Sequence, residues 1–216
     1  MKKHLIIPLV CVLTIAVASI FYLQYQKVSS HNPYNLSNGD IVFQETRGSQ
    51  GEAVKAATDS RWTHVGVVFY SDGKPMVIEA VQPVKITPLG RFISRSPKSF
   101  YAMRLKDADE RITPEAISKA EKYGGRQLGK DYDLKFQWSD ERIYCSELVW
   151  KIYQEAVGLE LCEIRPFSTY NLDHPTVQRM IKQRYESMDN LPMNEPCVAP
   201  SDLAQSNFLV EVPKRK

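Results

Sequence analysis

The sequence lacks the short motifs that mark several large classes of enzyme. It contains no Cys-x-x-Cys pair, no His-Glu-x-x-His motif and no glycine-rich phosphate loop, so the usual signatures of zinc sites and of nucleotide binding are missing. Its ten glycines and thirteen prolines follow no period, which excludes a collagen-like chain. No segment of about 20–50 residues repeats, so neither a solenoid nor a propeller is supported.

The chain also lacks a basic surface on its body. Its 216 residues include 28 Lys and Arg against 25 Asp and Glu, for a net charge of +3. Five of the basic residues lie at the two ends of the chain, namely Lys2, Lys3, Lys214, Arg215 and Lys216. Without these five, 23 basic residues stand against 25 acidic ones. Because a nucleic-acid-binding protein usually carries a basic face on the fold itself, we expect no nucleic-acid partner.

The first 23 residues have the pattern of a targeting segment. Lys2 and Lys3 precede an uncharged run over residues 5–23, which is typical of a secretory signal peptide or a signal anchor. As a helix this run would span about 28 Å, close to the hydrocarbon thickness of a bilayer. Residues 16–18 (AVA) favour cleavage, whereas the apolar residues 20–23 favour an uncleaved membrane anchor. In both cases we expect an exported body, periplasmic or on the extracytoplasmic face of the membrane, within the cell envelope.

The remainder of the chain is expected to form one folded body. Hydrophobic residues make up 43% of the sequence and charged residues 25%, which is close to the globular average. We expect a signal peptide or signal anchor over residues 1–23, a polar linker over 24–37, one domain over 38–209 and a frayed basic tail over 210–216.

The pattern of apolar residues and turn signals predicts an α+β fold. Strands are expected at residues 40–44, 65–70, 76–81 and 100–105. Helices are expected at residues 51–58, from Pro114 to the Gly124-Gly125 pair, from Cys145 to a stop at Gly158, and around residues 177–185. The Asp72-Gly73 pair predicts an antiparallel hairpin between the second and third strands. A group of strands bracketed by helices is an α+β arrangement.

Three cysteines lie beyond the targeting segment: Cys145, Cys162 and Cys197. An odd number cannot all pair within the chain, so one is expected to be a free thiol. Cys145 is the candidate because it opens a predicted helix, where backbone N–H groups and the helix dipole favour a thiolate and an oxyanion. An inert buried cysteine is the alternative. For Cys162 and Cys197, a disulfide and two free thiols both remain open.

His64 is the histidine best placed to act as a base for this thiol. If Asp72-Gly73 forms the turn, residues whose numbers add up to 145 lie opposite one another, and Gly66 faces Glu79. His64 then lies on the same face of the sheet as Glu79, diagonal to it and within reach. A register shifted by one residue would separate the two side chains. A carboxylate that orients an imidazole suits catalysis, and a polar pair without chemistry is the alternative.

The chain resembles the YiiX-like hydrolases of the circularly permuted NlpC/P60 (papain-like) superfamily, which also contains the lecithin–retinol acyltransferase relatives. The resemblance covers roughly residues 36–170. It rests on five segments, at residues 39–43 (GDIVF), 61–66 (RWTHVG), 78–81 (IEAV), 129–133 (GKDYD) and 144–150 (YCSELVW). The histidine precedes the cysteine, as in the permuted branch. Asp131 departs from relatives that often carry an apolar residue or proline there, which affects the expected shape of the loop.

The resemblance implies a permuted papain-like fold, with an antiparallel sheet packed against helices and the nucleophile at a helix N-terminus. It implies that Cys145 is the nucleophile, His64 the general base and Glu79 the third polar residue. Tyr144 would shape the substrate pocket, with its hydroxyl near the reaction intermediate. The implied chemistry is cleavage of an amide or ester through a thioester acyl-enzyme, which needs neither a metal nor a cofactor.

The expected partner is a peptide or lipid-linked substrate of the cell envelope. The location favours both a cell-wall peptide and a lipid-linked acyl group, and both hydrolysis and acyl transfer remain open. The alternative function is a peptide- or lipid-binding module whose papain-like pocket is catalytically idle.

Overall fold

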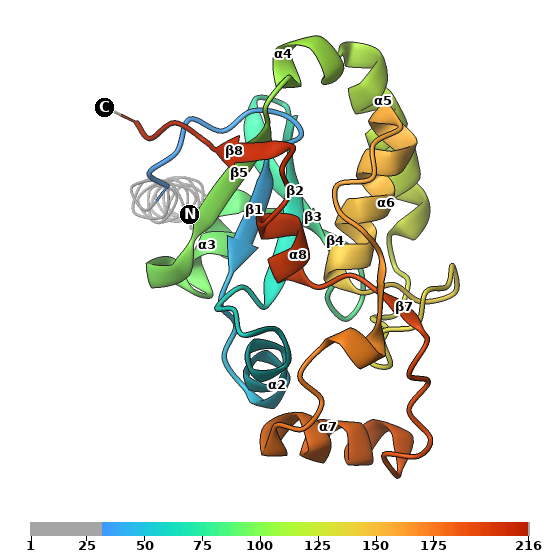
Figure 1. Cartoon of the computed structure of the whole chain (residues 1–216). Coiled ribbons are helices and arrows are strands. Elements are labelled where there is room, and N and C mark those ends of the chain that lie inside the picture. Colours follow the sequence, from blue (N-terminus) through green and yellow to red (C-terminus); the bar gives the residue numbers. More distant parts are fainter. Residues whose placement is uncertain (1–31, 216) are drawn as a thin grey trace, which may run out of the picture.

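Six antiparallel strands form one sheet at the centre of the computed structural model, which describes residues 32–215 (Figure 1). The strand order across the sheet is β4-β3-β2-β1-β5-β8. The strands are β1 (Ile41–Gln44), β2 (His64–Ser71), β3 (Lys74–Glu79), β4 (Lys85–Pro88), β5 (Tyr101–Leu105) and β8 (Leu209–Glu211). The four predicted strands are all present, and β4 and β8 extend the sheet at its two edges.

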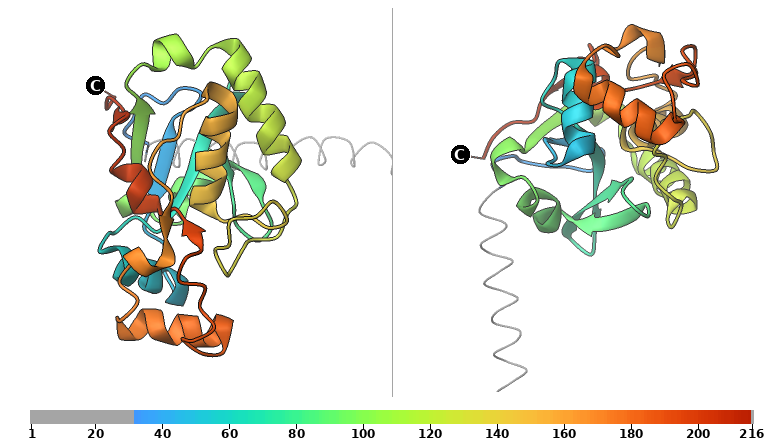
Figure 2. Two further views of the ribbon diagram at one scale, coloured as in Figure 1. Left: turned by 45° about the vertical axis from the view of Figure 1, so that its right-hand side comes forward. Right: turned by 90° about the horizontal axis from the view of Figure 1, so that it is seen from below.

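Helices lie on both faces of the sheet and beyond one end of it (Figure 1, Figure 2). Helices α5 and α6 pack against each other on one face, and α3 lies on the other. Helices α2 and α7 pack together beyond the end of the sheet, where Figure 2 shows them side by side. The helices are α2 (Ser49–Thr58), α3 (Leu89–Ser94), α4 (Ala108–Arg111), α5 (Pro114–Gln127), α6 (Cys145–Val157), α7 (Pro175–Tyr185) and α8 (Pro200–Ala204). The predicted α+β class is confirmed.

Short elements complete the fold around α7. A two-stranded sheet joins β6 (Arg165–Pro166) to β7 (Pro196–Cys197), so the segment that carries α7 leaves and rejoins the body at one place. Single helical turns occur at Pro97–Ser99 and Phe167–Thr169. The predicted helix around residues 177–185 is confirmed as α7.

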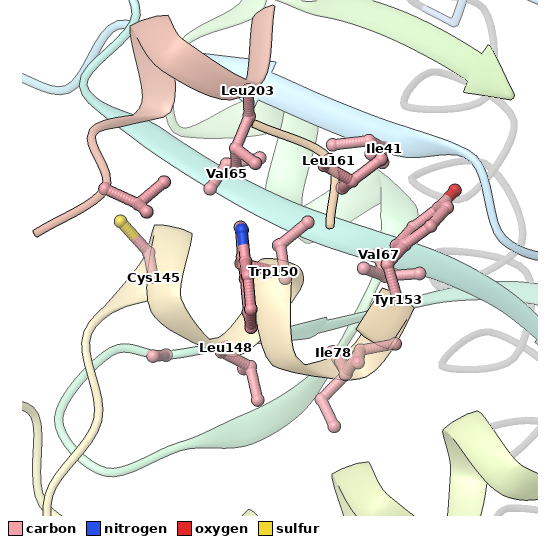
Figure 3. Packing of buried hydrophobic residues seen from close by; sticks show 14 of the residues in the cluster. Ile41, Val65, Val67, Ile78, Cys145, Leu148, Trp150, Tyr153, Leu161 and Leu203 are labelled. Atoms are coloured by element: carbon pink, nitrogen blue, oxygen red, sulfur yellow. The ribbon is translucent and has the colours of Figure 1, made fainter. Parts of the chain in front are cut away.

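The alternation of side chains along the strands divides the core into two layers. Val65, Val67 and Ile78 belong to the layer beneath α6, where Figure 3 shows them beside Leu148 and Cys145. Other residues of the central strands face the second layer, which packs against α3; they are Val42 of β1, Val68 of β2, Val77 of β3 and Ala102 of β5. The central strands are therefore buried on both faces. This burial explains their nearly continuous apolar sequence.

The signals at the ends of the two long helices act as expected, with one exception. Thr113 caps α5 by accepting a hydrogen bond from the backbone N–H of Ala116 at 3.2 Å, with Pro114 in the first turn. Helix α6 ends at Gly158, which has a left-handed φ of 65°. The prediction that α5 ends at Gly124-Gly125 is wrong, because the helix continues to Gln127. A Cβ at Gly124 would lie 2.6 Å from Ile78 Cδ1, so this glycine allows the helix to approach the sheet closely.

The folded body extends further at both ends than the predicted boundaries of 38 and 209. Tyr34 and Leu36 are buried in the layer next to α3, and Tyr34 forms a β-bridge with Lys214. Val212, in the expected tail, is 1% exposed. These apolar side chains pack in the same layer as Val42 of β1 and Ala102 of β5, so residues from the expected linker and tail belong to the core.

The targeting prediction for residues 1–23 and the linker residues 24–31 lie outside the described residues. Among the helices of residues 32–215, none has the length and apolar character that crossing a bilayer requires. Cys145, Cys162 and Cys197 are all free thiols in the structure, which selects one of the two open alternatives for Cys162 and Cys197.

Candidate active site

The three residues expected at the catalytic centre lie at the ends of three adjacent elements. Cys145 is the first residue of α6, His64 the first of β2 and Glu79 the last of β3. The predicted hairpin register is confirmed, because Val67 pairs with Ile78 and Ser71 with Lys74. This register brings His64 and Glu79 to the same face. Helix α6 packs against β2, so its N-terminus reaches the same end of the sheet.

His64 forms a buried hydrogen bond with Glu79. Its Nε2 atom lies 2.6 Å from Glu79 Oε2, and the Glu79 side chain is 0% exposed. Because Nε2 is engaged with the carboxylate, Nδ1 is the ring nitrogen left for the thiol. His64 also faces Cys145 closely enough for each group to shift the pKa of the other toward its ionised form. The order of groups is therefore thiol, imidazole, carboxylate.

Gly66 makes this approach of the strands possible. A Cβ on Gly66 would lie 2.6 Å from Val77 Cγ1, 2.8 Å from the Ile78 carbonyl oxygen and 3.4 Å from Glu79 Cβ. Two of these distances are shorter than a non-bonded carbon contact allows. Any side chain here would displace β3, and with it the carboxylate.

Glu79 has two further partners that the sequence did not reveal. Thr87 Oγ1 donates to Glu79 Oε1 at 2.6 Å, and Arg95 Nη2 donates to Oε2 at 2.5 Å. Burial by itself would raise the pKa of Glu79, but the hydrogen bonds and charges of His64, then Arg95 and Thr87, lower the pKa to about 2. Glu79 is therefore ionised at every pH at which the protein would work.

The imidazole ring is also held by an aromatic neighbour. Phe92 of α3 stacks on His64 with ring centroids 5.7 Å apart and an angle of 28° between the planes. Arg95 lies over the same Phe92 ring at 5.1 Å. The backbone of Phe92 is fixed in turn, because Gln44 Nε2 donates to its carbonyl oxygen at 2.5 Å. The sheet and α3 together thus restrain both the plane of the His64 ring and its hydrogen bond.

The electrostatics favour a thiolate and an imidazolium. Burial tends to raise the pKa of the Cys145 thiol, but the hydrogen bond and charge of His64, with a smaller contribution from Tyr132, lower this pKa below its usual value. Burial tends to lower the pKa of His64, but hydrogen bonds to Cys145 and Glu79 raise the pKa to about 9. A thiolate is the form of cysteine that attacks a carbonyl carbon.

Tyr132 is a residue of the site to which the sequence motifs assigned no role. Its hydroxyl lies 3.9 Å from Cys145 Sγ and accepts a hydrogen bond from Gln50 Nε2 at 3.1 Å. The residue lies within the GKDYD segment at 129–133, so a signal for it was present in the sequence. Its backbone N–H donates to Gln82 Oε1 at 2.7 Å, which fixes the loop beside the thiol.

An apolar pocket of about 110 Å³ opens at Cys145. Helices α2 and α7 both line the pocket, with Ala53 and Ala57 from α2 and Met180 and Ile181 from α7. Its lining also includes the aromatic residues Tyr132, Phe136, Tyr144, Phe167, Tyr170 and Tyr185. Such a pocket suits a substrate group that is apolar next to the bond being cleaved.

Comparison with known proteins identifies the family of the chain. Residues 35–212 match the model of a family described as "Permuted papain-like amidase enzyme, YaeF/YiiX, C92 family". The chain belongs to this family. It is 39% identical over 176 residues to the "Uncharacterized protein YiiX" of Escherichia coli (strain K12), and the match covers 82% of this chain and 85% of that protein.

A solved structure extends the comparison to three dimensions. The "Crystal structure of metalloprotein yiiX from Escherichia coli O157:H7, DUF1105" superposes with a TM-score of 0.78 at 38% identity. The match covers 84% of this chain and 99% of that one. The resemblance inferred from the five sequence segments is confirmed, and the fold is that of a permuted papain-like amidase.

Tyr144 lies in the pocket wall, but its hydroxyl is engaged away from the thiol. The residue is 1% exposed, and its hydroxyl oxygen accepts a hydrogen bond from the backbone N–H of Val198 at 3.2 Å. The hydroxyl that lies beside the sulfur is that of Tyr132. The reason is local: Tyr144 precedes the first turn of α6 and points to β7, whereas Tyr132 comes from the loop that crosses in front of Cys145.

Glu147 stabilises the start of the helix that carries the thiol. Its Oε2 accepts a hydrogen bond from the Tyr144 backbone N–H at 3.3 Å, and its Oε1 lies 2.9 Å from Lys151 Nζ. Burial raises the pKa of Glu147 to about 7, although Lys151 opposes this shift. Because both of its oxygens face groups of its own helix, we assign Glu147 to capping α6.

Proposed function

We propose that this chain is a cysteine hydrolase that cleaves an amide or ester bond of an acyl substrate through a thioester on Cys145. The observation that carries the proposal is the alignment of Cys145, His64 and Glu79 at the mouth of an apolar pocket. Family membership gives the coarser activity, that of a papain-like amidase. A pure binding module has no need for a thiol whose pKa is lowered by an oriented imidazole.

Cys145, His64 and Glu79 each have a defined role in the proposed reaction. The Cys145 thiolate attacks the carbonyl carbon, forming a C–S bond, and the carbonyl oxygen takes up the negative charge beside the N-terminus of α6. His64 Nδ1 gives its proton to the leaving nitrogen or oxygen, and the C–N or C–O bond breaks. A water molecule then gives a proton to His64 and attacks the thioester, which breaks the C–S bond and releases the acid. Glu79 keeps the imidazole oriented and stabilises its charge throughout.

The shape of the pocket favours a lipid-linked acyl group over a cell-wall peptide. Alanines and a methionine from α2 and α7 line the pocket together with its aromatic side chains. Arg184 is the only Lys, Arg, Asp or Glu among the described residues that line it. A peptide from a cell wall carries several charges and amides that would need partners in such a pocket.

Export follows as part of the same proposal. The basic start and the uncharged run over residues 5–23 support delivery of the body to the extracytoplasmic side of a membrane. A membrane at that position would supply lipid-linked acyl substrates directly.

The relative of known crystal structure is described as a metalloprotein. The donors that this chain offers do not suit a metal ion. Within residues 32–215 no three His, Cys, Asp or Glu side chains are grouped as metal ligands. Glu79 already binds His64, and Arg95 places a positive charge 2.5 Å from its Oε2. We therefore derive no step through a metal.

Intact-protein mass spectrometry with activated esters tests the function. We expect p-nitrophenyl esters to leave an acyl group on Cys145, and kcat/KM to rise by up to about fourfold for each methylene buried in the pocket. Cys145→Ala should abolish the adduct, and Cys162→Ser should leave it unchanged. Cleavage of muropeptides in preference to acyl esters would overturn the substrate class. An acyl chain that binds without forming an adduct would establish the idle binding module instead.

The pH dependence provides a second test of the pairing. The reactive form has Cys145 ionised and His64 protonated, so activity should appear above the lowered pKa of the thiol and decline as pH rises through about 9, the pKa of His64. A measured profile of kcat/KM from acid to alkaline pH with no decline on the alkaline side would contradict the ion pair.

A further inference from the structure

A line of four side chains connects α7 to the thiol. Arg184 Nη2 in α7 donates to Gln50 Oε1 in α2 at 2.8 Å, and Gln50 Nε2 donates to the Tyr132 hydroxyl oxygen at 3.1 Å. The Tyr132 hydroxyl in turn lies 3.9 Å from Cys145 Sγ. The line crosses four segments of the chain that meet only in the folded protein.

Arg184 fixes the direction of every donor in this line. A guanidinium group has donors and no acceptor, so the atom of Gln50 that faces it must be the carbonyl oxygen. The NH₂ group of Gln50 then faces Tyr132 and donates to it. Because the Tyr132 oxygen accepts this hydrogen bond, its own proton is left to point at the remaining neighbour, which is Cys145 Sγ.

Arg184 is itself held firmly. Its Nη1 donates to the Leu134 carbonyl oxygen at 2.6 Å, and its guanidinium lies over the Phe136 ring at 5.2 Å. Phe136 has a φ of 55°, a left-handed conformation that is strained for an aromatic residue and costs on the order of 1–3 kcal/mol. Both terminal nitrogens of Arg184 donate within the chain, so the guanidinium is fixed between Gln50 of α2 and the loop at Leu134.

We propose that Arg184 and Gln50 are positioning residues that direct the Tyr132 hydroxyl proton to Cys145, so that the packing of α7 against α2 is coupled to the reactivity of the thiol. This inference rests on the proposed function, because it concerns activation of the same cysteine. Tyr132 is suited to the role because burial, followed by the neighbouring Cys145, raises its pKa and keeps its proton in place. The other titratable group that acts on Cys145 is His64, with Glu79 behind it on the sheet. Glu147 lies two residues further along the same helix and faces Lys151.

The test is the pH dependence of Cys145 alkylation by iodoacetamide in the full chain, followed on the Cys145 peptide by mass spectrometry. Loss of one hydrogen bond to a thiolate should raise the midpoint of this curve by on the order of one pH unit. We expect this shift in Tyr132→Phe, Gln50→Leu and Arg184→Met. The control is Arg179→Met, which removes an exposed arginine from the same helix and should leave the midpoint unchanged.

The Gln50→Glu variant separates the direction of the hydrogen bond between Gln50 and Tyr132 from the packing of α7 against α2. A carboxylate at this position keeps a strong partner for Arg184 but has no proton to donate to Tyr132, whose hydroxyl would then turn toward the carboxylate. We expect the same upward shift as in Gln50→Leu with the thermal stability retained, so the test does not depend on Arg184→Met folding. An unchanged midpoint in Gln50→Glu would overturn the proposal.

A double-mutant cycle completes the test. Once Tyr132→Phe has removed the hydroxyl, adding Gln50→Leu should cause no further shift, because both act through the same proton. Shifts that add together would overturn the positioning role. The wild-type curve reports separately on the proposed function: a wild-type midpoint at the value of a free cysteine would refute the activated thiol, whereas a lowered wild-type midpoint with unshifted variants would refute only the role of Arg184 and Gln50.

Discussion

The two sides of the reactive thiol are built in different ways. On one side, His64 and Glu79 come from adjacent strands of a hairpin and lie 15 residues apart in the sequence. On the other side, Gln50 and Tyr132 are 82 residues apart, and Arg184 is 134 residues from Gln50. The hairpin register fixes the first side, whereas the second depends on the packing of two helices and a loop. The position of the base therefore depends on one hairpin, whereas the position of the hydroxyl next to the thiol depends on how α7 packs against α2.

Glu79→Gln disturbs the side of the thiol that His64 and Glu79 form, and it should have the largest effect on kcat. The amide keeps the shape of the carboxylate but removes the charge that stabilises the imidazolium, and kcat should fall by about 10²–10⁴-fold. Steady-state kinetics with an activated ester measure this loss. The matched control is Glu160→Gln at an exposed position, which should retain full activity. A variant with nearly wild-type kcat would mean that Glu79 has no part in orienting His64.

The same contrast explains how much of the site could be predicted from the sequence. The register between β2 and β3 follows from one turn and from alternation, so the pairing of His64 with Glu79 was accessible. Helix α6 was accessible too, because its apolar period runs from Leu148 to Gly158. These are local patterns with periods of about 2 and 3.6 residues, which a single sequence contains.

The residues that were missed depend on contacts between distant segments. Arg95 and Thr87 reach Glu79 from the end of α3 and from β4, a strand of four residues that the sequence analysis did not predict. Gln50 and Arg184 lie on α2 and α7, whose packing is not encoded in either helix alone. The boundaries of the body were misplaced for a related reason. Tyr34 and Val212 are buried against the sheet by tertiary packing, although their flanking sequences are polar.

Gly66→Ala disturbs the strands that carry His64 and Glu79 without removing a polar side chain. The new Cβ would meet Val77 Cγ1 and the Ile78 carbonyl oxygen at 2.6 and 2.8 Å, and β3 must shift to relieve these contacts. We expect a loss of about 1–3 kcal/mol in the free energy of unfolding, measured by urea denaturation. Gly125→Ala is the control, because nothing lies within 4 Å of its Cβ position and the change favours the helix by about 0.5–1 kcal/mol. Equal effects in the two variants would show that the strands are not closely packed at Gly66.

Arg95→Gln should have the smallest effect on kcat. The direction of its effect on stability follows from the pKa of Glu79. The pKa of Glu79 is lowered from its ordinary value to about 2 by His64 first and then by Arg95 and Thr87 against the cost of burial. A group whose pKa is lower in the folded state stabilises the fold above its unfolded pKa of 4.5 and loses this contribution as pH falls toward 2. Because the Arg95 side chain is 38% exposed, its share is reduced by solvent, and we expect kcat to fall by only about two- to fivefold.

Thermal stability at acidic pH distinguishes the contribution of Arg95 to the pKa of Glu79 from those of His64 and Thr87. With Arg95→Gln the pKa of Glu79 in the folded state should rise, so the loss of thermal stability on acidification should begin at a higher pH than in the wild type. Thermal unfolding followed by circular dichroism from neutral pH down to about 2 measures this difference. Arg91→Gln, at an exposed position of α3, should leave the curve unchanged. If Arg95→Gln also left the curve of stability against pH unchanged, His64 and Thr87 alone would account for the low pKa of Glu79. The orientation of His64 by Glu79 would then not depend on the partly exposed Arg95.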